Sequence, residues 1–158
     1  MVWASRGHTP LIKLDPSRTC THFYGALNLL TGQEAVVMQA ATMNAETSAL
    51  FLQKILTAIP KGPIVLLWDK APWHRGPEIT QILADNPRLQ LIRFPTAAPE
   101  LNPQEHVWKA TREAVSHNHA SKNFETLAHD FETHLTATTF PCSFLHKFDY
   151  PSLCMLFK

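Results

Sequence analysis

The sequence has few cysteines, and their spacing excludes two common kinds of site. The chain has three, Cys20, Cys142 and Cys154, and no two of them form a CxxC pair. An odd number at these spacings argues against a disulfide framework and against a zinc knuckle. This pattern fits a reducing compartment, so we expect the protein to be cytoplasmic.

Long hydrophobic runs are also absent. No stretch approaches the roughly 20 apolar residues of a membrane span. The first 20 residues lack the apolar segment of a secretory signal. Since 45% of the 158 residues are hydrophobic, the chain can build one domain with a core but not two. We expect one domain over residues 1–140, a tail over 141–158, and no membrane partner.

The chain has little net charge, and what it has is unevenly placed. The formal charge is +1 overall, with +1 over residues 1–60, +2 over 61–112 and −2 over 113–158. The basic excess therefore surrounds the middle of the chain. An excess this small permits contact with nucleic acid but does not establish it.

Periodic stretches, mostly separated by prolines, predict the secondary structure of the first half. Aromatic and β-branched residues around a glycine turn at 31–33 predict a hairpin over about 21–44. Asn44 can cap a helix that ends near Pro60. The continuous apolar run "PIVLLW" then predicts a strand covered on both faces in a parallel sheet.

The second half continues this alternation. We expect a helix over 77–85, a strand "LQLIRF" at 89–94, a long helix from Asn102 to about His117 and a helix over about 123–136. The order ββαβαβαα predicts an α/β layered domain with a mixed sheet. We expect the long helix to bury one face, which carries Val107, Trp108, Thr111, Ala114 and Val115.

Two acids stand where such folds place their chemistry. Asp69 follows the buried strand, at the sheet edge where α/β folds open a ligand crevice. Glu105 lies in the first turn of a helix whose Asn102 and Pro103 can form a capping-box start. Each acid has a structural alternative, since Asp69 can form a turn and Glu105 can serve only as a cap.

Other residues near these acids carry weaker signals. His74 fits a surface position, the start of a helix or a place near a phosphate. Trp68, Trp73 and Trp108 are more typical of core and loop anchors than of base-stacking platforms. The letters HNH at 117–119 lack the ββα-metal context of the nuclease motif of that name, and we set them aside.

Taken jointly, "LLWDKAPWH" and "PELNPQEHVWK" resemble the second and third acidic motifs of DDE transposases, in the bacterial insertion-sequence branch of the mariner superfamily. Asp69, His74 and residues 101–108 match the family pattern, whereas Lys70 stands where the family commonly has Asn. "VWASRGHTP" at 2–10 is similar to the family's Trp-Ala-x-x-Gly-x-x-Pro segment. The resemblance covers about residues 2–136.

The resemblance implies a ribonuclease H-like mixed sheet flanked by helices, and metal-dependent DNA strand cleavage and transfer during transposition. Asp69 and Glu105 would be the catalytic metal ligands, and their hard oxygen donors suit Mg²⁺ or Mn²⁺. The implied partner is DNA, both transposon ends and target. Residues expected to contact that DNA are Lys70, His74, Arg75, Lys109 and Arg112.

One element of the family pattern has no match in the chain. The family's first catalytic aspartate lies on the opening strand, just before the Trp-Ala segment, so we expect it to lie upstream of Met1. Asp15 follows that segment and is a poor substitute. A missing opening strand leaves neighbouring strand edges unpaired, and such edges recruit other chains. We therefore expect a homodimer, unless residues 8–14 fill the gap.

Three hypotheses remain open at this point. The chain is the catalytic domain of a transposase, incomplete at its N-terminus. Alternatively, it is a catalytically dead remnant that acts only in DNA or subunit binding. In the third, it is an unrelated α/β domain whose motif match is accidental. An in-frame aspartate just upstream in the genomic DNA would favour the first over the second.

Overall fold

The computed structural model describes residues 20–95, 101–116 and 123–140, together with Asp149, Ser152 and Met155. The segment with Asp15 and "VWASRGHTP", the letters HNH and most of the expected tail lie outside these residues. The strands are β1 (His22–Asn28), β2 (Gln33–Ala40), β3 (Ile64–Trp68) and β4 (Leu89–Arg93). The helices are α1 (Ala45–Ala58), α2 (Pro77–Asp85), α3 (Pro103–Thr111) and α4 (Phe124–Ala137).

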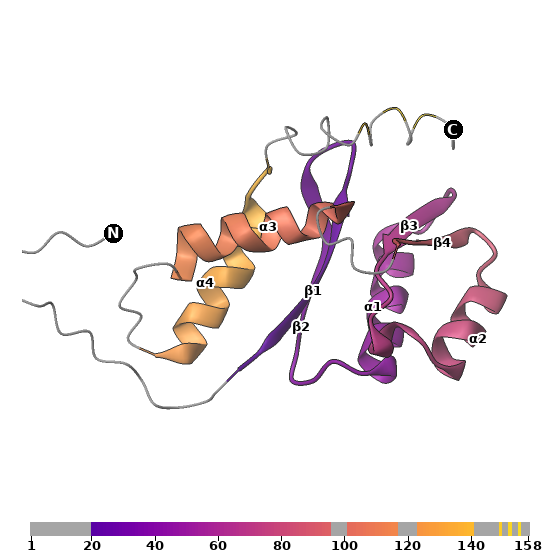
Figure 1. Ribbon diagram of the computed structural model, residues 1–158, viewed down its shortest axis with the longest axis horizontal. Coiled ribbons are helices and arrows are strands. Elements are labelled where there is room, and N and C mark those ends of the chain that lie inside the picture. The colour runs from indigo at the N-terminus through magenta and orange to yellow at the C-terminus, as the bar shows by residue number, and fades with distance from the viewer. Residues whose placement is uncertain are drawn as a thin grey trace, which may run out of the picture.

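The predicted order of elements is confirmed, and the hairpin β1–β2 lies in the middle of it. Figure 1 shows α3 and α4 together on one side of the hairpin, with α1, α2, β3 and β4 on the other. The two strands pair antiparallel from His22 opposite Ala40 to Asn28 opposite Gln33. The turn forms because Asn28 Oδ1 accepts the amide of Leu30 at 2.9 Å and Gly32 takes a φ of 73°.

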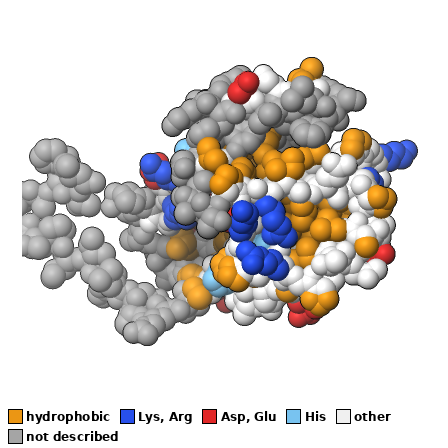
Figure 2. Space-filling view, turned by 45° about the vertical axis from the view of Figure 1, so that its right-hand side comes forward, with side chains coloured by type: hydrophobic (Ala, Val, Ile, Leu, Met, Phe, Trp, Pro, Cys, Tyr) orange, Lys and Arg blue, Asp and Glu red, His pale blue; other side chains and the backbone are white. Residues whose placement is uncertain are grey.

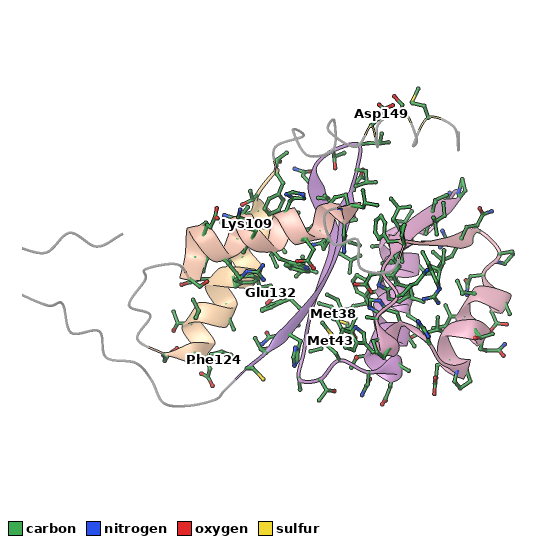
Figure 3. The ribbon with its side chains drawn as sticks, viewed as in Figure 1. Met38, Met43, Lys109, Phe124, Glu132 and Asp149 are labelled. Carbon is green, nitrogen blue, oxygen red and sulfur yellow. The ribbon has the colours of Figure 1, made fainter. Side chains whose placement is uncertain are left out.

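Both faces of the hairpin are packed, because successive side chains of a strand point to opposite sides. On one face Tyr24 and Met38 join the core formed with α1, α2, β3 and β4, and Figure 3 shows Met38 and Met43 between the hairpin and α1. On the other face Phe23 and Val37 pack against the core of α3 and α4. The hairpin is thus shared by two hydrophobic cores.

Helix α1 is fixed at both ends by side chains. Its N-cap Asn44 accepts the amide of Thr47 at 2.8 Å, and the Thr47 hydroxyl accepts the Asn44 amide in return. At its C-terminal end the Arg88 guanidinium donates to the carbonyls of Ile59 at 2.7 Å and Leu56 at 2.9 Å. Asn44 as the cap and the end before Pro60 are as predicted.

Strands β3 and β4 form the expected parallel pair, from Ile64 opposite Leu89 to Trp68 opposite Arg93. They do not join the hairpin, because no hydrogen bonds link β1 to β3 in the described part of the chain. The predicted mixed sheet is therefore present as two separate two-stranded sheets. This break also leaves the middle of β3 only partly covered, where the apolar run predicted burial on both faces.

The long helix predicted to reach about His117 is shorter as an α-helix. After Thr111 the chain continues as a π-helical turn over Arg112–Ser116. A π turn holds more residues than an α turn, so it shifts the following side chains around the axis. Val107 and Thr111 are buried as predicted, but Ala114 is exposed. Trp108 and Val115 are half-buried, so Ala114 is the residue of the predicted inward stripe that the π turn exposes.

We expect Leu135→Ala to destabilise the fold by roughly 2–5 kcal/mol, because the side chain is fully buried between α4 and the hairpin and its removal leaves a cavity. Leu30→Ala is the matched control, since Leu30 is 53% exposed in the hairpin turn. Chemical denaturation measures both. Equal effects of the two substitutions would contradict the assignment of this second core.

Candidate active site

Asp69 is the first residue after β3, as expected, and its carboxylate is held from one side. The Ala71 amide donates to Asp69 Oδ1 at 2.9 Å. His74, at the end of the short 3-10 turn Pro72–His74, brings its Nδ1 within 2.7 Å of the same oxygen. Both contacts engage one carboxylate oxygen, and Asp69 remains about half exposed. The second oxygen, Oδ2, is therefore left to face the cavity described below.

His74 is buried, at 6% exposure, and does not lie on the surface. Its ring stacks on Trp68 with centroids 4.0 Å apart. The contact of His74 with the Asp69 carboxylate lowers the pKa of Asp69, and the Ala71 amide adds to this against the opposing effect of burial. These contacts favour a role for His74 in holding Asp69 ionised over direct contact with DNA.

Arg93 also belongs to this half of the site, although the sequence reading did not single it out. Its guanidinium donates to the His74 carbonyl at 3.1 Å. Its positive charge further lowers the pKa of Asp69. Because Arg93 is the β4 partner of Trp68 in the parallel pair, pairing of the two strands could have placed it there.

Glu105 lies in the first turn of α3, and the helix begins as predicted at Asn102 and Pro103. Asn102 Oδ1 accepts the amide of Gln104 at 3.1 Å, so the cap is made by the asparagine side chain. The Glu105 carboxylate accepts no hydrogen bond from the residues that the structure describes. A carboxylate here is favoured by the helix dipole. The cap and a free Glu105 carboxylate therefore coexist.

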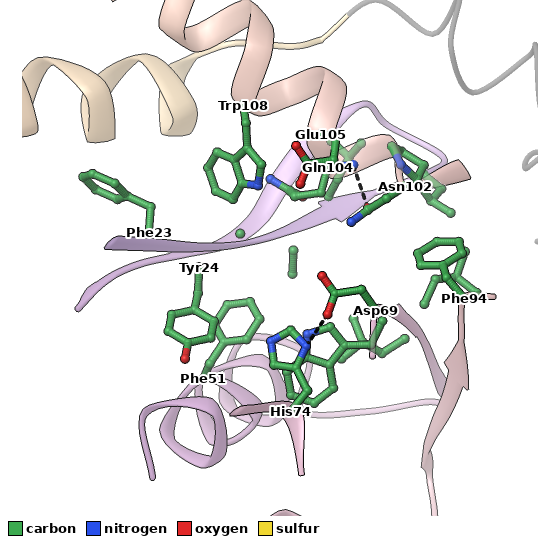
Figure 4. Close-up of a pocket in the computed structure, with 18 of the residues that line it drawn as sticks. Phe23, Tyr24, Phe51, Asp69, His74, Phe94, Asn102, Gln104, Glu105 and Trp108 are labelled. Carbon is green, nitrogen blue, oxygen red and sulfur yellow. Dashed lines mark hydrogen bonds and ion pairs between the residues drawn. The ribbon is translucent and has the colours of Figure 1, made fainter. Parts of the chain in front are cut away.

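Asp69 and Glu105 line the same cavity, of about 240 Å³. Figure 4 shows them on opposite walls, Asp69 next to His74 and Glu105 on the first turn of α3 beside Gln104. Consecutive residues of β1 and of β3 also line the cavity, and these two strands do not pair with each other in the described part of the chain. The cavity therefore occupies the gap between the two sheets.

The donors in this cavity suit a hard divalent cation. The cavity is lined by the carboxylates of Asp69 and Glu105 and by Asn102, whose side chain carries an amide oxygen. Mg²⁺ and Mn²⁺ prefer such oxygen ligands. Across residues 20–95, 101–116 and 123–140, no group of three or more His, Cys, Asp or Glu residues is arranged to hold a metal ion. The described residues thus bring two carboxylates to the lining of the cavity.

A third acid lies behind the cavity, and the sequence reading also missed it. Glu34 Oε1 accepts a short hydrogen bond from Gln104 Nε2, and Glu34 Oε2 is sealed from solvent with no partner among the described residues. Burial raises the pKa of Glu34 to about 7, against the lowering effects of its hydrogen bonds with the Gln104 side chain and the Ala26 backbone. The polar alternation of β2 gave no signal, because most acids at such positions are solvated.

The basic residues predicted to contact DNA are exposed but not all adjacent. Lys70 and Arg75 flank the Asp69 loop, where Arg75 donates to the Lys70 carbonyl at 3.3 Å. Lys109, labelled on α3 in Figure 3, and Arg112 are exposed and do not line the cavity. Figure 2 shows Lys and Arg side chains gathered beside hydrophobic ones on one face.

Residues 1–128 match the family described as DDE superfamily endonuclease. The chain belongs to this family. Among curated relatives, an uncharacterized 39 kDa protein of insertion element IS630 from Shigella sonnei is 28% identical over 121 residues, covering 74% of this chain and 34% of that protein. Protein y4pE/y4sA of Sinorhizobium fredii (strain NBRC 101917 / NGR234) is 36% identical over 73 residues, covering 46% and 48%.

Solved structures of the Mos1 transposase share the fold of this DDE endonuclease chain. The Mos1 paired-end complex with the left transposon end superposes with a TM-score of 0.68 at 15% identity, covering 94% of this chain and 46% of that one. The Mos1 strand transfer complex gives 0.69 at 15% identity, covering 96% and 47%. One further similar structure is the Mos1 mariner paired-end complex with Mn.

This DDE endonuclease chain spans about a third to a half of the length of the curated relatives it matches, 34% and 48%. None of the helices in the described ranges is both long and apolar enough to cross a membrane. The comparisons thus establish the family and the fold. The site residues remain predictions.

The raised pKa of Glu34 predicts a pH-dependent stability. Because the folded-state pKa of about 7 exceeds the ordinary 4.5, the folded protein binds this proton more tightly than the unfolded chain does. The free energy of unfolding should therefore fall as the pH rises from 4.5 to 7. Glu34→Gln should remove this fall and stabilise the protein above neutral pH by on the order of 2–3 kcal/mol.

Urea unfolding at about pH 5 and pH 8 measures the effect. Glu46→Gln is the matched control, because Glu46 is an exposed glutamate in the first turn of α1. A stability difference between wild type and Glu34→Gln that stays constant over this range would contradict the raised pKa.

Proposed function

We propose that this chain is the catalytic part of a DDE transposase, which cuts and joins DNA strands at the ends of a mobile element. One observation carries the proposal. Asp69 and Glu105 are separated by 35 residues in the sequence, yet both line one cavity between a strand end and a helix start. The family match and the likeness to transposase structures support the same reaction class.

In this proposal Asp69 and Glu105 hold Mg²⁺ or Mn²⁺. Bound divalent ions would activate a water or 3′ hydroxyl and stabilise charge on the leaving oxygen of the phosphodiester. Asp69 can ligate through Oδ2, since its other oxygen is engaged by His74 and Ala71. Its lowered pKa keeps the carboxylate ionised and ready to bind a cation. His74 and Arg93 orient this ligand.

A third carboxylate completes the site in our proposal, carried by a strand outside the described residues. The unpaired edges of β1 and β3 face the cavity that contains Asp69 and Glu105. One strand between them would join the hairpin and the parallel pair into a single mixed sheet, the ribonuclease H-like arrangement implied by the family. A side chain from that strand would enter the cavity between the two acids.

The catalytically dead remnant is the second candidate. The described residues bring two carboxylates to the cavity and no third. This observation favours the remnant over an active catalytic domain. Such a chain would act through DNA or through another subunit. The unpaired strand edges support self-association, so a homodimer belongs to both candidates.

The activity prediction separates the two candidates. The chain as given is expected to bind Mn²⁺ weakly and not to nick transposon-end DNA, since the described residues bring two carboxylates to the cavity and no ligand shared by both ions. Extending the chain before Met1 by roughly 10 to 20 residues that carry an aspartate on a strand should give Mn²⁺-dependent nicking. Plasmid nicking on a gel and Mn²⁺ titration measure the two effects.

The controls are Asp69→Asn and Glu105→Gln in the extended protein, which keep side-chain size but remove the negative charge. Each is expected to abolish nicking. Nicking that survives both substitutions would mean that the wrong residues are assigned. An extended protein that folds, binds Mn²⁺ and still does not nick favours the remnant.

DNA binding by the chain is expected to be weak and independent of sequence. Lys70→Ala and Arg75→Ala should each lower the affinity and reduce the slope of log affinity against log salt by about 1, because each removes one phosphate contact. Lys61→Ala is the control, since Lys61 is exposed and precedes the start of β3, whereas Lys70 and Arg75 follow its end. Fluorescence anisotropy measures the affinities. Tight, sequence-specific binding at high salt would contradict this prediction.

A further inference from the structure

A hydrogen bond between two side chains attaches helix α3 to the hairpin, and this bond is separate from the Asn102 cap. Gln104 Nε2 donates a short hydrogen bond to Glu34 Oε1, which lies 70 residues earlier in the chain at the start of β2. Gln104 lines the cavity and directly precedes Glu105. The pair therefore fixes the helix start at the residue next to the proposed metal ligand.

The glycine at position 25 makes room for this pair. A Cβ on Gly25 would lie 2.5 Å from Gln104 Nε2, 2.8 Å from Glu34 Oε1 and 2.9 Å from Trp108 Cη2. These distances are shorter than side-chain contacts allow. The φ of Gly25 is not among the positive values, so the glycine is required by space and not by backbone conformation. Three elements thus meet at one point.

The pair carries a cost in stability. Glu34 Oε2 is buried and unpartnered in the described part of the chain, and a buried polar atom without a hydrogen bond destabilises the fold. A glutamine at position 34 could accept the same hydrogen bond without burying a carboxyl.

The position of Glu105 depends on rotation of the helix start, which the Asn102 cap does not fix. Successive side chains of an α-helix lie about 100° apart around its axis, so a Gln104 side chain held against the hairpin determines the direction of its neighbour. Metal ligands tolerate errors of only about 0.5 Å. Release of Gln104 would let the first turn of α3 rotate.

We propose that Glu34 is a positioning residue of the site, which acts through Gln104 to fix Glu105 in the cavity. This inference rests on the proposed function only in taking Glu105 as a metal ligand. Its own content is mechanical, because it states that the Glu34–Gln104 pair orders the first turn of α3. The test therefore measures that order separately from metal binding.

The experiment compares Glu34→Ala, Gln104→Ala and their double substitution with the exchanged pair Glu34→Gln/Gln104→Glu. Mn²⁺ is the probe, titrated by electron paramagnetic resonance, and amide hydrogen exchange over residues 104–108 reports the order of the helix start. Each alanine variant should weaken Mn²⁺ binding about 10-fold and speed exchange. The double variant should be no worse than either single one.

Restoration and a matched control separate positioning from general stability. The exchanged pair should recover both readouts to within about 3-fold, because donor and acceptor are merely reversed. Glu34→Gln alone should also keep them, since its amide oxygen still accepts from Gln104. Gln39→Ala is the control on the same strand, where the Gln39 amide bonds Thr21 away from the cavity. It should change neither readout.

Two results would overturn the proposal. If Glu34→Gln loses Mn²⁺ binding as fully as Glu105→Gln, then Glu34 is itself a ligand. If the alanine variants leave amide exchange over residues 104–108 unchanged, the pair does not order the helix start. Should the wild-type chain bind no Mn²⁺, faster exchange in the alanine variants still supports positioning, and the failure then belongs to the proposed metal site.

Discussion

The packing of hairpin β1–β2 on both faces is the constraint on which the rest of the structure depends. One face carries the core with α1, α2, β3 and β4, and the other carries α3 and α4. Asp69 belongs to the first assembly and Glu105 to the second. No hydrogen-bonded strand of the described chain links β1 to β3. The two acids are brought to one cavity because both assemblies pack against the same hairpin.

The two halves of the site differ in how they are held. Asp69 is fixed by a short network of His74, Ala71 and Arg93, which also favours its ionised form. Glu105 is left without such partners in the described residues, and its surroundings are set by the helix start instead. One acid is therefore held by direct contacts of its carboxylate and the other through the first turn of its helix, and contacts between charges respond more strongly to salt.

Much of this arrangement follows from local sequence. Asn44, Asn102 and Pro103 mark helix starts by capping chemistry, and "PIVLLW" marks a strand by composition. Glu34 and Arg93 could not be found in this way, because their roles depend on contacts with Gln104 and His74 across elements. The exposed Ala114 was missed for a related reason, since nothing in its neighbours distinguishes a π turn from an α turn.

The break between the two sheets has a consequence for the geometry of the site. The two sheets of the described chain share no strand pairing, so the position of Asp69 relative to Glu105 depends on how side chains pack on the hairpin. A small cluster of Phe94, Leu27, Leu67 and Leu101 adds to that packing beside the cavity. A substitution in this cluster would therefore change the separation of the two acids without touching either of them.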